Sequence, residues 1–184
     1  FFKPLGAAFT TYNPLHKFDM SVIPPTEIDN YFRYQTIQGY VHDMAAAMQD
    51  GIAGHAGLFS NAMDVAKIMQ MYLQEGNYGG KQYFSAKTFE TFNTCHACKQ
   101  GNRRGLGFDK PQIGNNPGPT CGCVSKGSFG HTGFTGTMAW ADPETGIVYI
   151  FLSNRTYPEA GENRLSKENI REDIQKVIQE AIIE

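Results

Sequence analysis

Three short segments near the end of the chain most constrain its fold, because each has the length of a strand and turns separate them. They run from Ser128 to Gly133, from Thr137 to Ala141 and from Ile147 to Ser153. Between the second and the third, Asp142-Pro143-Glu144-Thr145-Gly146 is typical of a tight turn. This spacing predicts an antiparallel meander.

The last of these segments also limits what surrounds the sheet. Ile147 to Leu152 is apolar on both faces, so we expect a covering layer on each side. A helix predicted from about Ser166 supplies one layer. Its apolar residues repeat at helical spacing as a stripe that would lie on the sheet: Ile170, Ile174, Val177, Ile178, Ala181 and Ile182. A further strand is expected at Gly105 to Phe108.

Helices and irregular chain are expected before residue 100. The clearest helix begins at Asn61, which forms a capping-box pattern with Asp64, and ends at Gly76. Shorter helices are expected after Asp43 and from Ser85. The first 40 residues are rich in Pro, Thr, Tyr and Asn, and we expect extended chain and turns there without a deep core.

The predicted fold class is α/β in the α+β sense, on one domain spanning residues 1–184. Residues 1–100 form the mainly helical or irregular region, and residues 101–184 form the antiparallel sheet with its covering C-terminal helix. The opening residues, Phe1 to Gly6, carry neither an initiator Met nor the regions of a signal peptide. We therefore expect the chain to be a piece of a longer protein.

Charge and hydropathy exclude several classes of partner. The formal net charge is −2, from 16 basic and 18 acidic residues without a basic stripe, so neither nucleic acid nor an anionic membrane is implied. No apolar run approaches the roughly 20 residues that span a bilayer, so no transmembrane segment is predicted. Small molecules, sugars and peptides remain as partners.

The stretch from Phe129 to Thr137 is the most informative for chemistry. It places the titratable ring of His131 and the hydroxyl of Thr132 on a predicted strand, between glycines that leave the backbone open to a ligand. On chemistry alone, however, a single histidine in a strand is more often a structural hydrogen-bonding residue than a catalyst.

The order of motifs around this stretch resembles the penicillin-recognising serine hydrolases, which include class C β-lactamases, penicillin-binding proteins and bacterial esterases. His131-Thr132-Gly133 resembles their third signature, which is Lys-Thr-Gly in many members and His-Thr-Gly in many β-lactamase-like esterases. Trp140, Asp142-Pro143 and Leu152-Ser153-Asn154-Arg155 then follow in the family's order.

Two upstream segments agree with this resemblance. Phe2-Lys3-Pro4-Leu5-Gly6 resembles a family segment that continues with Met where this chain has Ala7, and Gly54 to Ser60 with Asp64 resembles another. The chain also resembles the serine-hydrolase module attached to bacterial family 3 glycoside hydrolases. The resemblance implies a partial β-lactamase/transpeptidase-like fold and an exported location in the bacterial periplasm or cell envelope.

The resemblance also implies roles for particular residues. His131 and Thr132, followed by Gly133, line the cleft and hydrogen-bond the carboxylate or leaving group of the substrate. The backbone N–H of Phe134 supplies half of an oxyanion hole. The implied activity is acyl-enzyme chemistry on an ester, an amide or a peptidoglycan-like peptide, with no cofactor for catalysis.

The residues that would start this chemistry are missing. No serine is followed three positions later by the Lys of the Ser-x-x-Lys nucleophile motif, and no Tyr or Ser is followed two positions later by the Asn of the second signature. We therefore expect the isolated chain to be inactive. The upstream half of the same protein, with a glycoside hydrolase domain as a further partner, would supply both motifs.

His55 is a weak candidate for substrate binding, because its Gly-rich loop permits close approach to a ligand. The alternative, which we favour, is a histidine that bonds loop carbonyls.

The four cysteines form two close pairs, Cys95 with Cys98 and Cys121 with Cys123. This spacing suits either a structural Zn²⁺ or disulfides, and both readings stay open. Because two cysteines so close in sequence bridge poorly to each other, disulfides are expected to join a cysteine of one pair to a cysteine of the other. A rival to the hydrolase hypothesis is therefore a non-catalytic module, held together by zinc or disulfides, that binds carbohydrate or cell wall.

Overall fold

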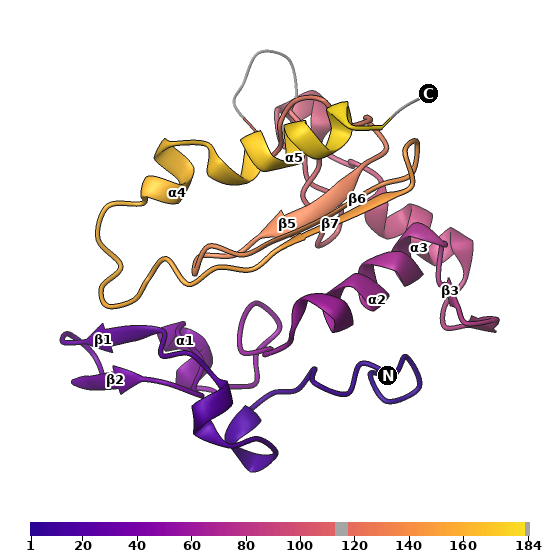
Figure 1. Cartoon of the computed structure of the whole chain (residues 1–184). Coiled ribbons are helices and arrows are strands. Elements are labelled where there is room, and N and C mark those ends of the chain that lie inside the picture. Colours follow the sequence, from indigo (N-terminus) through magenta and orange to yellow (C-terminus); the bar gives the residue numbers. More distant parts are fainter. Residues whose placement is uncertain (113–117, 183–184) are drawn as a thin grey trace.

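A three-stranded antiparallel sheet lies between helices on its two faces in the computed structural model, which describes residues 1–112 and 118–182 (Figure 1). Its strands are β5 (Phe129–Thr132), β6 (Met138–Asp142) and β7 (Ile147–Phe151), in the order β5-β6-β7. Gly130 pairs with Trp140, and Trp140 with Tyr149. The meander expected from the sequence is confirmed.

Helix α2 (Ala62–Leu73) covers one face of the sheet, and α5 (Ile170–Glu180) covers the other (Figure 1). On the α2 face, Met69 packs with the buried side chains of Phe129 and Ala141. On the opposite face, the Tyr149 hydroxyl donates a hydrogen bond to the Arg171 carbonyl of α5, at 3.1 Å. Both faces of the sheet are therefore covered, as the apolar strand requires.

Side-chain caps start the helices where the sequence predicts them. Asn61 Oδ1 accepts from the Asp64 N–H at 2.9 Å and begins α2. Asp43 and Ser85 cap α1 (Met44–Ala47) and α3 (Ala86–Asn93) in the same way. Among the described residues, no helix is long and apolar enough to cross a membrane.

The first 40 residues fold into short turns and one hairpin. The 3₁₀ turns η1 (Pro14–His16) and η2 (Met20–Val22) precede the antiparallel pair β1 (Glu27–Asp29) and β2 (Gln35–Ile37). Ile37 is fully buried, and Leu5 packs against Met71 of α2. The expectation that this region lacks a deep core is wrong, because its few apolar residues pack against later elements.

Around helix α3, residues 77–108 form short strands and turns. They contain the two-residue strands β3 (Asn77–Tyr78) and β4 (Lys81–Gln82), and the 3₁₀ turn η3 (Cys98–Gln100). The strand expected at Gly105 to Phe108 is absent: that segment turns back on itself, and only Asp109 bridges to Gly130 of β5. Two glycines in four residues favour the turn.

The C-terminal helix presents a different face to the sheet from the one expected. It is divided into α4 (Arg164–Lys167) and α5, and the residues of α5 that are buried are Arg171 and Gln175. Gln175 Oε1 accepts from the Cys121 N–H at 3.0 Å. The predicted apolar stripe faces outward instead, and its exposed members include Ile174, Val177, Ile178 and Ile182.

Gly130 offers a test of the sheet packing. A Cβ there would lie 2.5 Å from the Trp140 ring and closer still to the Ala139 carbonyl. We expect Gly130→Ala to destabilise the chain by about 1–3 kcal/mol through overpacking, measured as a lower urea midpoint at unchanged slope. Gly54→Ala is the matched control, because no atom lies within 4 Å of that position. Equal midpoints for the two variants would contradict this packing.

Candidate active site

Strand β5 places His131 and Thr132 at an open edge of the sheet. On the side away from β6, the only described backbone partner of β5 is Asp109, which pairs with Gly130. Because side chains alternate along a strand, His131 leaves the sheet on the same face as Phe129, the α2 face. His131 is exposed and Thr132 is half-buried, so neither side chain is enclosed in the core.

His131 contacts an arginine that the sequence analysis missed. Arg104 Nη1 lies 3.0 Å from His131 Nε2. Since a guanidinium only donates hydrogen bonds, Nε2 must be the acceptor, and the ring proton must lie on Nδ1. His131 Nδ1 lies 2.6 Å from the Thr132 carbonyl, which fits that donor. The contacts therefore favour a neutral imidazole in the Nδ1–H form.

The charge of Arg104 is only weakly compensated. Its guanidinium is half-exposed and lies 3.9 Å from the Asp109 carboxylate, which Arg103 contacts more closely, at 2.8 Å. Arg104 directly precedes the Gly105-Leu106-Gly107 turn, but nothing in the local pattern says that this turn returns to β5. The bridge from Asp109 to Gly130 places the segment that carries Arg104 beside His131.

The turn between β5 and β6 presents the backbone N–H of Phe134. The Gly133 N–H donates to the Thr137 carbonyl at 2.7 Å, and the Gly136 N–H donates to the Gly133 carbonyl at 3.0 Å. The Phe134 N–H has no acceptor among the described residues. This amide is therefore free to donate to a ligand beside Thr132.

His55 lies against a carboxylate instead of the loop carbonyls that we favoured. Its Nε2 is 2.9 Å from Asp43 Oδ1, and both side chains are about half-exposed. The Ala46 backbone N–H, followed by the His55 ring, holds the pKa of Asp43 below its ordinary value. No described contact joins His55 to His131, so the structure does not bring the two histidines together.

The cysteines form disulfides within each pair: Cys95 with Cys98, and Cys121 with Cys123. The expected pairing between the two pairs is wrong, because Cα separations of 5.6 and 5.2 Å already suit a bridge within each pair. Across residues 1–112 and 118–182, no three His, Cys, Asp or Glu side chains are grouped to hold a metal ion. Residues 113–117 of the loop between the pairs lie outside the described residues.

A helix-covered antiparallel sheet whose outer strand carries His-Thr-Gly fits the β-lactamase-like fold. A match to the Beta-lactamase family model spans residues 10–170, and the chain belongs to this family.

Relatives and solved structures agree with this assignment. Over 171 residues, the chain is 37% identical to a protein of Escherichia coli K12 named "Putative D-alanyl-D-alanine carboxypeptidase", and 36% identical to one of the same name from Salmonella enteritidis. Each match covers 85% of this chain but only 38% of the relative. A β-lactamase structure from Mycobacterium bovis covers 97% of this chain and 51% of its own, at a TM-score of 0.56 and 20% identity, and shows the same fold.

The tautomer of His131 can be tested by NMR. We expect ¹⁵N spectra of the neutral ring to show a protonated Nδ1 and an unprotonated Nε2, and we expect Arg104→Ala to weaken that preference. His96 is an internal reference for the other tautomer, because its Nε2 lies 2.8 Å from the Thr91 carbonyl and must carry the proton. A protonated Nε2 on neutral His131 would contradict the Arg104 contact.

Thiol and metal analysis separates the two readings of the cysteines. Protein purified without chelator or reductant should contain no free thiol and no zinc, and peptide mapping should recover Cys95–Cys98 and Cys121–Cys123. Reduction should release four thiols. One zinc per chain, lost on thiol alkylation, would instead support a structural metal site.

Proposed function

We propose that this chain forms one side of a serine acyl-transfer site, whose nucleophile comes from another part of the same protein. The observation that carries the proposal is the open edge of β5, where His131, Thr132 and the unpaired N–H of Phe134 are adjacent. None of these groups is a nucleophile with a base beside it. Their chemistry suits substrate binding and charge stabilisation.

Each group has a distinct task in that chemistry. When a serine attacks a carbonyl carbon, negative charge develops on the carbonyl oxygen, and the Phe134 N–H donates to that oxyanion. Such a donor acts mainly in the transition state, so it raises kcat more than it lowers KM. The Thr132 hydroxyl and the Arg104 guanidinium beside His131 bind the part of the substrate beyond the reacting bond.

Arg104 favours a substrate that carries a carboxylate. A guanidinium matches a carboxylate with two parallel hydrogen bonds, and the weak compensation by Asp109, at 3.9 Å, leaves Arg104 available for this. The relatives named as carboxypeptidases fit the same chemistry. Among the expected substrates, we therefore place a cell-wall peptide with a free C-terminus ahead of a neutral ester or amide.

Two exposed surfaces support the proposal that a further segment of the protein completes the fold. Among the described strands, β7 pairs only with β6, so its outer edge is open. On α5, Ile174, Val177 and Ile178 are exposed in a row. Unpaired strand edges and contiguous apolar faces are normally covered in a native protein. We propose that the upstream half covers them and brings the Ser-x-x-Lys motif, with a glycoside hydrolase domain as a further partner.

The disulfides support an exported location. Disulfides persist in oxidising compartments and are rare in the bacterial cytosol. The pairs Cys95–Cys98 and Cys121–Cys123 therefore suit the periplasm or cell envelope.

Hydrolysis assays with and without the upstream half test the proposal. The pure chain should not hydrolyse nitrocefin or a chromogenic ester, whereas the longer protein should release D-alanine from a peptide ending in D-Ala-D-Ala. In the longer protein, Arg104→Ala should raise KM for that peptide by about 10-fold, the size of one lost charge-assisted hydrogen bond. The matched control, Arg164→Ala, removes an exposed arginine whose side chain forms an ion pair with Glu168 on the same helical segment.

Two results would contradict the proposal. Turnover by the pure chain would show that no second segment is needed. A longer protein that contains Ser-x-x-Lys but hydrolyses no acyl substrate would favour the rival, a module that binds carbohydrate or cell wall.

A further inference from the structure

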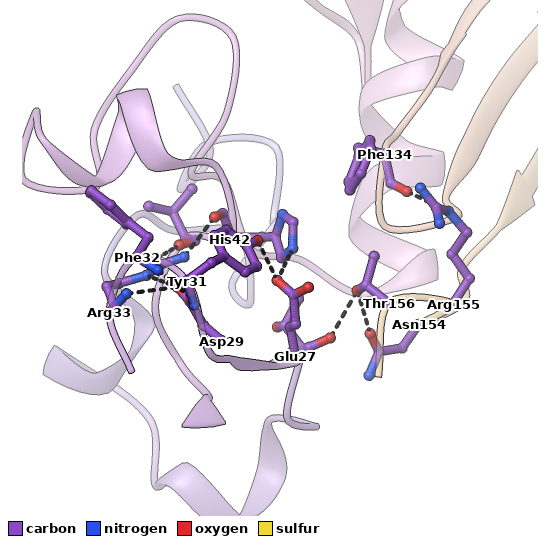
Figure 2. Close-up of polar contacts among 12 residues, drawn as sticks. Glu27, Asp29, Tyr31, Phe32, Arg33, His42, Phe134, Asn154, Arg155 and Thr156 are labelled. Carbon is purple, nitrogen blue, oxygen red and sulfur yellow. Dashed lines mark hydrogen bonds and ion pairs between the residues drawn. The ribbon is translucent and has the colours of Figure 1, made fainter. Parts of the chain in front are cut away.

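The ring of Phe134 lies between two side chains that come from distant parts of the sequence (Figure 2). The His42 ring stacks on it, with centroids 5.3 Å apart and an angle of 26° between the planes. The Arg155 guanidinium carbon lies 4.5 Å from the centre of the same ring. Because Phe134 is 64% exposed, the core does not hold this ring, and these two side chains do.

Arg155 also binds the backbone of the turn. Its Nε donates to the Phe134 carbonyl at 2.8 Å, and its backbone N–H donates to the Thr135 carbonyl at 3.0 Å. On the other side of Phe134, the Gly133 carbonyl accepts from Gly136. In a trans peptide the N–H points away from the preceding carbonyl, so these bonds direct the Phe134 N–H out of the turn.

His42 is itself held in one orientation. Its Nε2 lies 2.7 Å from Glu27 Oε2, and the Tyr31 hydroxyl donates to the same oxygen at 2.9 Å (Figure 2). Glu27 is only 3% exposed, so its carboxylate is largely shielded from water. A buried carboxylate with two partners leaves the imidazole little freedom to rotate away from Phe134.

The backbone of His42 is fixed by Arg33. This arginine donates to the His42 carbonyl at 2.7 Å and pairs with the Asp29 carboxylate at 3.1 Å. Burial raises the pKa of Asp29, but hydrogen bonds from Phe32, Tyr31 and Arg33 outweigh burial and lower it to about 2. Asp29 therefore stays ionised at any ordinary pH, and Arg33 keeps its partner.

The two segments that flank the Phe134 ring are also hydrogen-bonded to each other. The Thr156 hydroxyl donates to the Thr26 carbonyl at 2.8 Å, and the Ile28 N–H donates to the Pro158 carbonyl at 2.7 Å. The Asn154 amide also donates to the Pro25 carbonyl. These bonds attach the segment that carries Arg155 to the hairpin that orients His42.

We propose that His42 and Arg155 are positioning residues for the Phe134 N–H, and that Glu27 orients His42. This inference rests on the proposed function, in which that N–H stabilises the oxyanion. An oxyanion donor is effective when it is fixed before the reaction, and a displacement of about 1 Å can cost 10²-fold in rate. Neither positioning residue needs to touch the substrate.

Kinetics of the longer protein that carries the nucleophile test the proposal. We expect His42→Ala and Arg155→Ala each to lower kcat by roughly 10- to 100-fold while KM changes by less than about 2-fold. His42→Phe preserves the stacked ring, so it should keep most of the kcat that His42→Ala loses. His96→Ala and Arg164→Ala are the matched controls, since both side chains lie in exposed local contacts.

The Phe134 amide gives a second readout that needs no activity. In ¹H–¹⁵N spectra of this chain, His42→Ala and Arg155→Ala should shift and broaden the Phe134 signal, and His42→Phe should broaden it less. If the longer wild-type protein has no activity, the proposed function fails. The Phe134 amide signal then still tests whether His42 and Arg155 position that N–H. Unchanged kcat in the alanine variants, or an unmoved Phe134 signal, would overturn the positioning role.

Discussion

The one-sided pairing of β5 determines where chemistry can occur in this chain. β6 pairs with one edge of the strand, and on the other edge the described part of the chain forms a single bridge, from Asp109 to Gly130. The next residues, His131 and Thr132, are therefore ordered by the sheet and still open on one side. The register also matters, because a slip of one residue would move His131 to the Trp140 face and bury it.

The proposed site is composite, and its parts come from four places in the sequence. Arg104 follows α3, Phe134 lies in the turn after β5, His42 precedes α1, and Arg155 follows β7. Hydrogen bonds between the N-terminal hairpin and the segment after β7 link the last two. A site assembled in this way can be rigid at its edge even though Phe134 itself is largely exposed, since rigidity comes from the contacts of its neighbours.

Local signals explain what the sequence predicted correctly. The β5–β7 meander, the caps at Asn61 and Ser85, and the His131 motif each depend on residues within a few positions of one another. The orientation of α5, by contrast, is not set by local sequence. Periodicity shows that the helix has an apolar face, but not what that face contacts. Here the buried residues of α5 are Arg171 and Gln175, and Gln175 accepts a hydrogen bond from the Cys121 N–H in the loop before β5.

Long-range contacts explain what the sequence analysis missed. The approach of Arg104 to His131, and of His42 and Arg155 to Phe134, depends on how turns return to the sheet. The cysteine pairs were misjudged for another reason, since the backbone at both places brings the Cα atoms close enough to bridge within each pair. The approach of Arg104, His42 and Arg155 to their partners has no signature in a short window of sequence.

The central claim is that the open edge of β5 binds the carboxylate end of a substrate, and an NMR titration of this chain with N-acetyl-D-alanine tests it most directly. The account predicts shifts that saturate together at Arg104, His131, Thr132 and Phe134, and much smaller shifts with the uncharged amide of the same compound. Shifts that are absent from these residues, or equal for the acid and the amide, would contradict it.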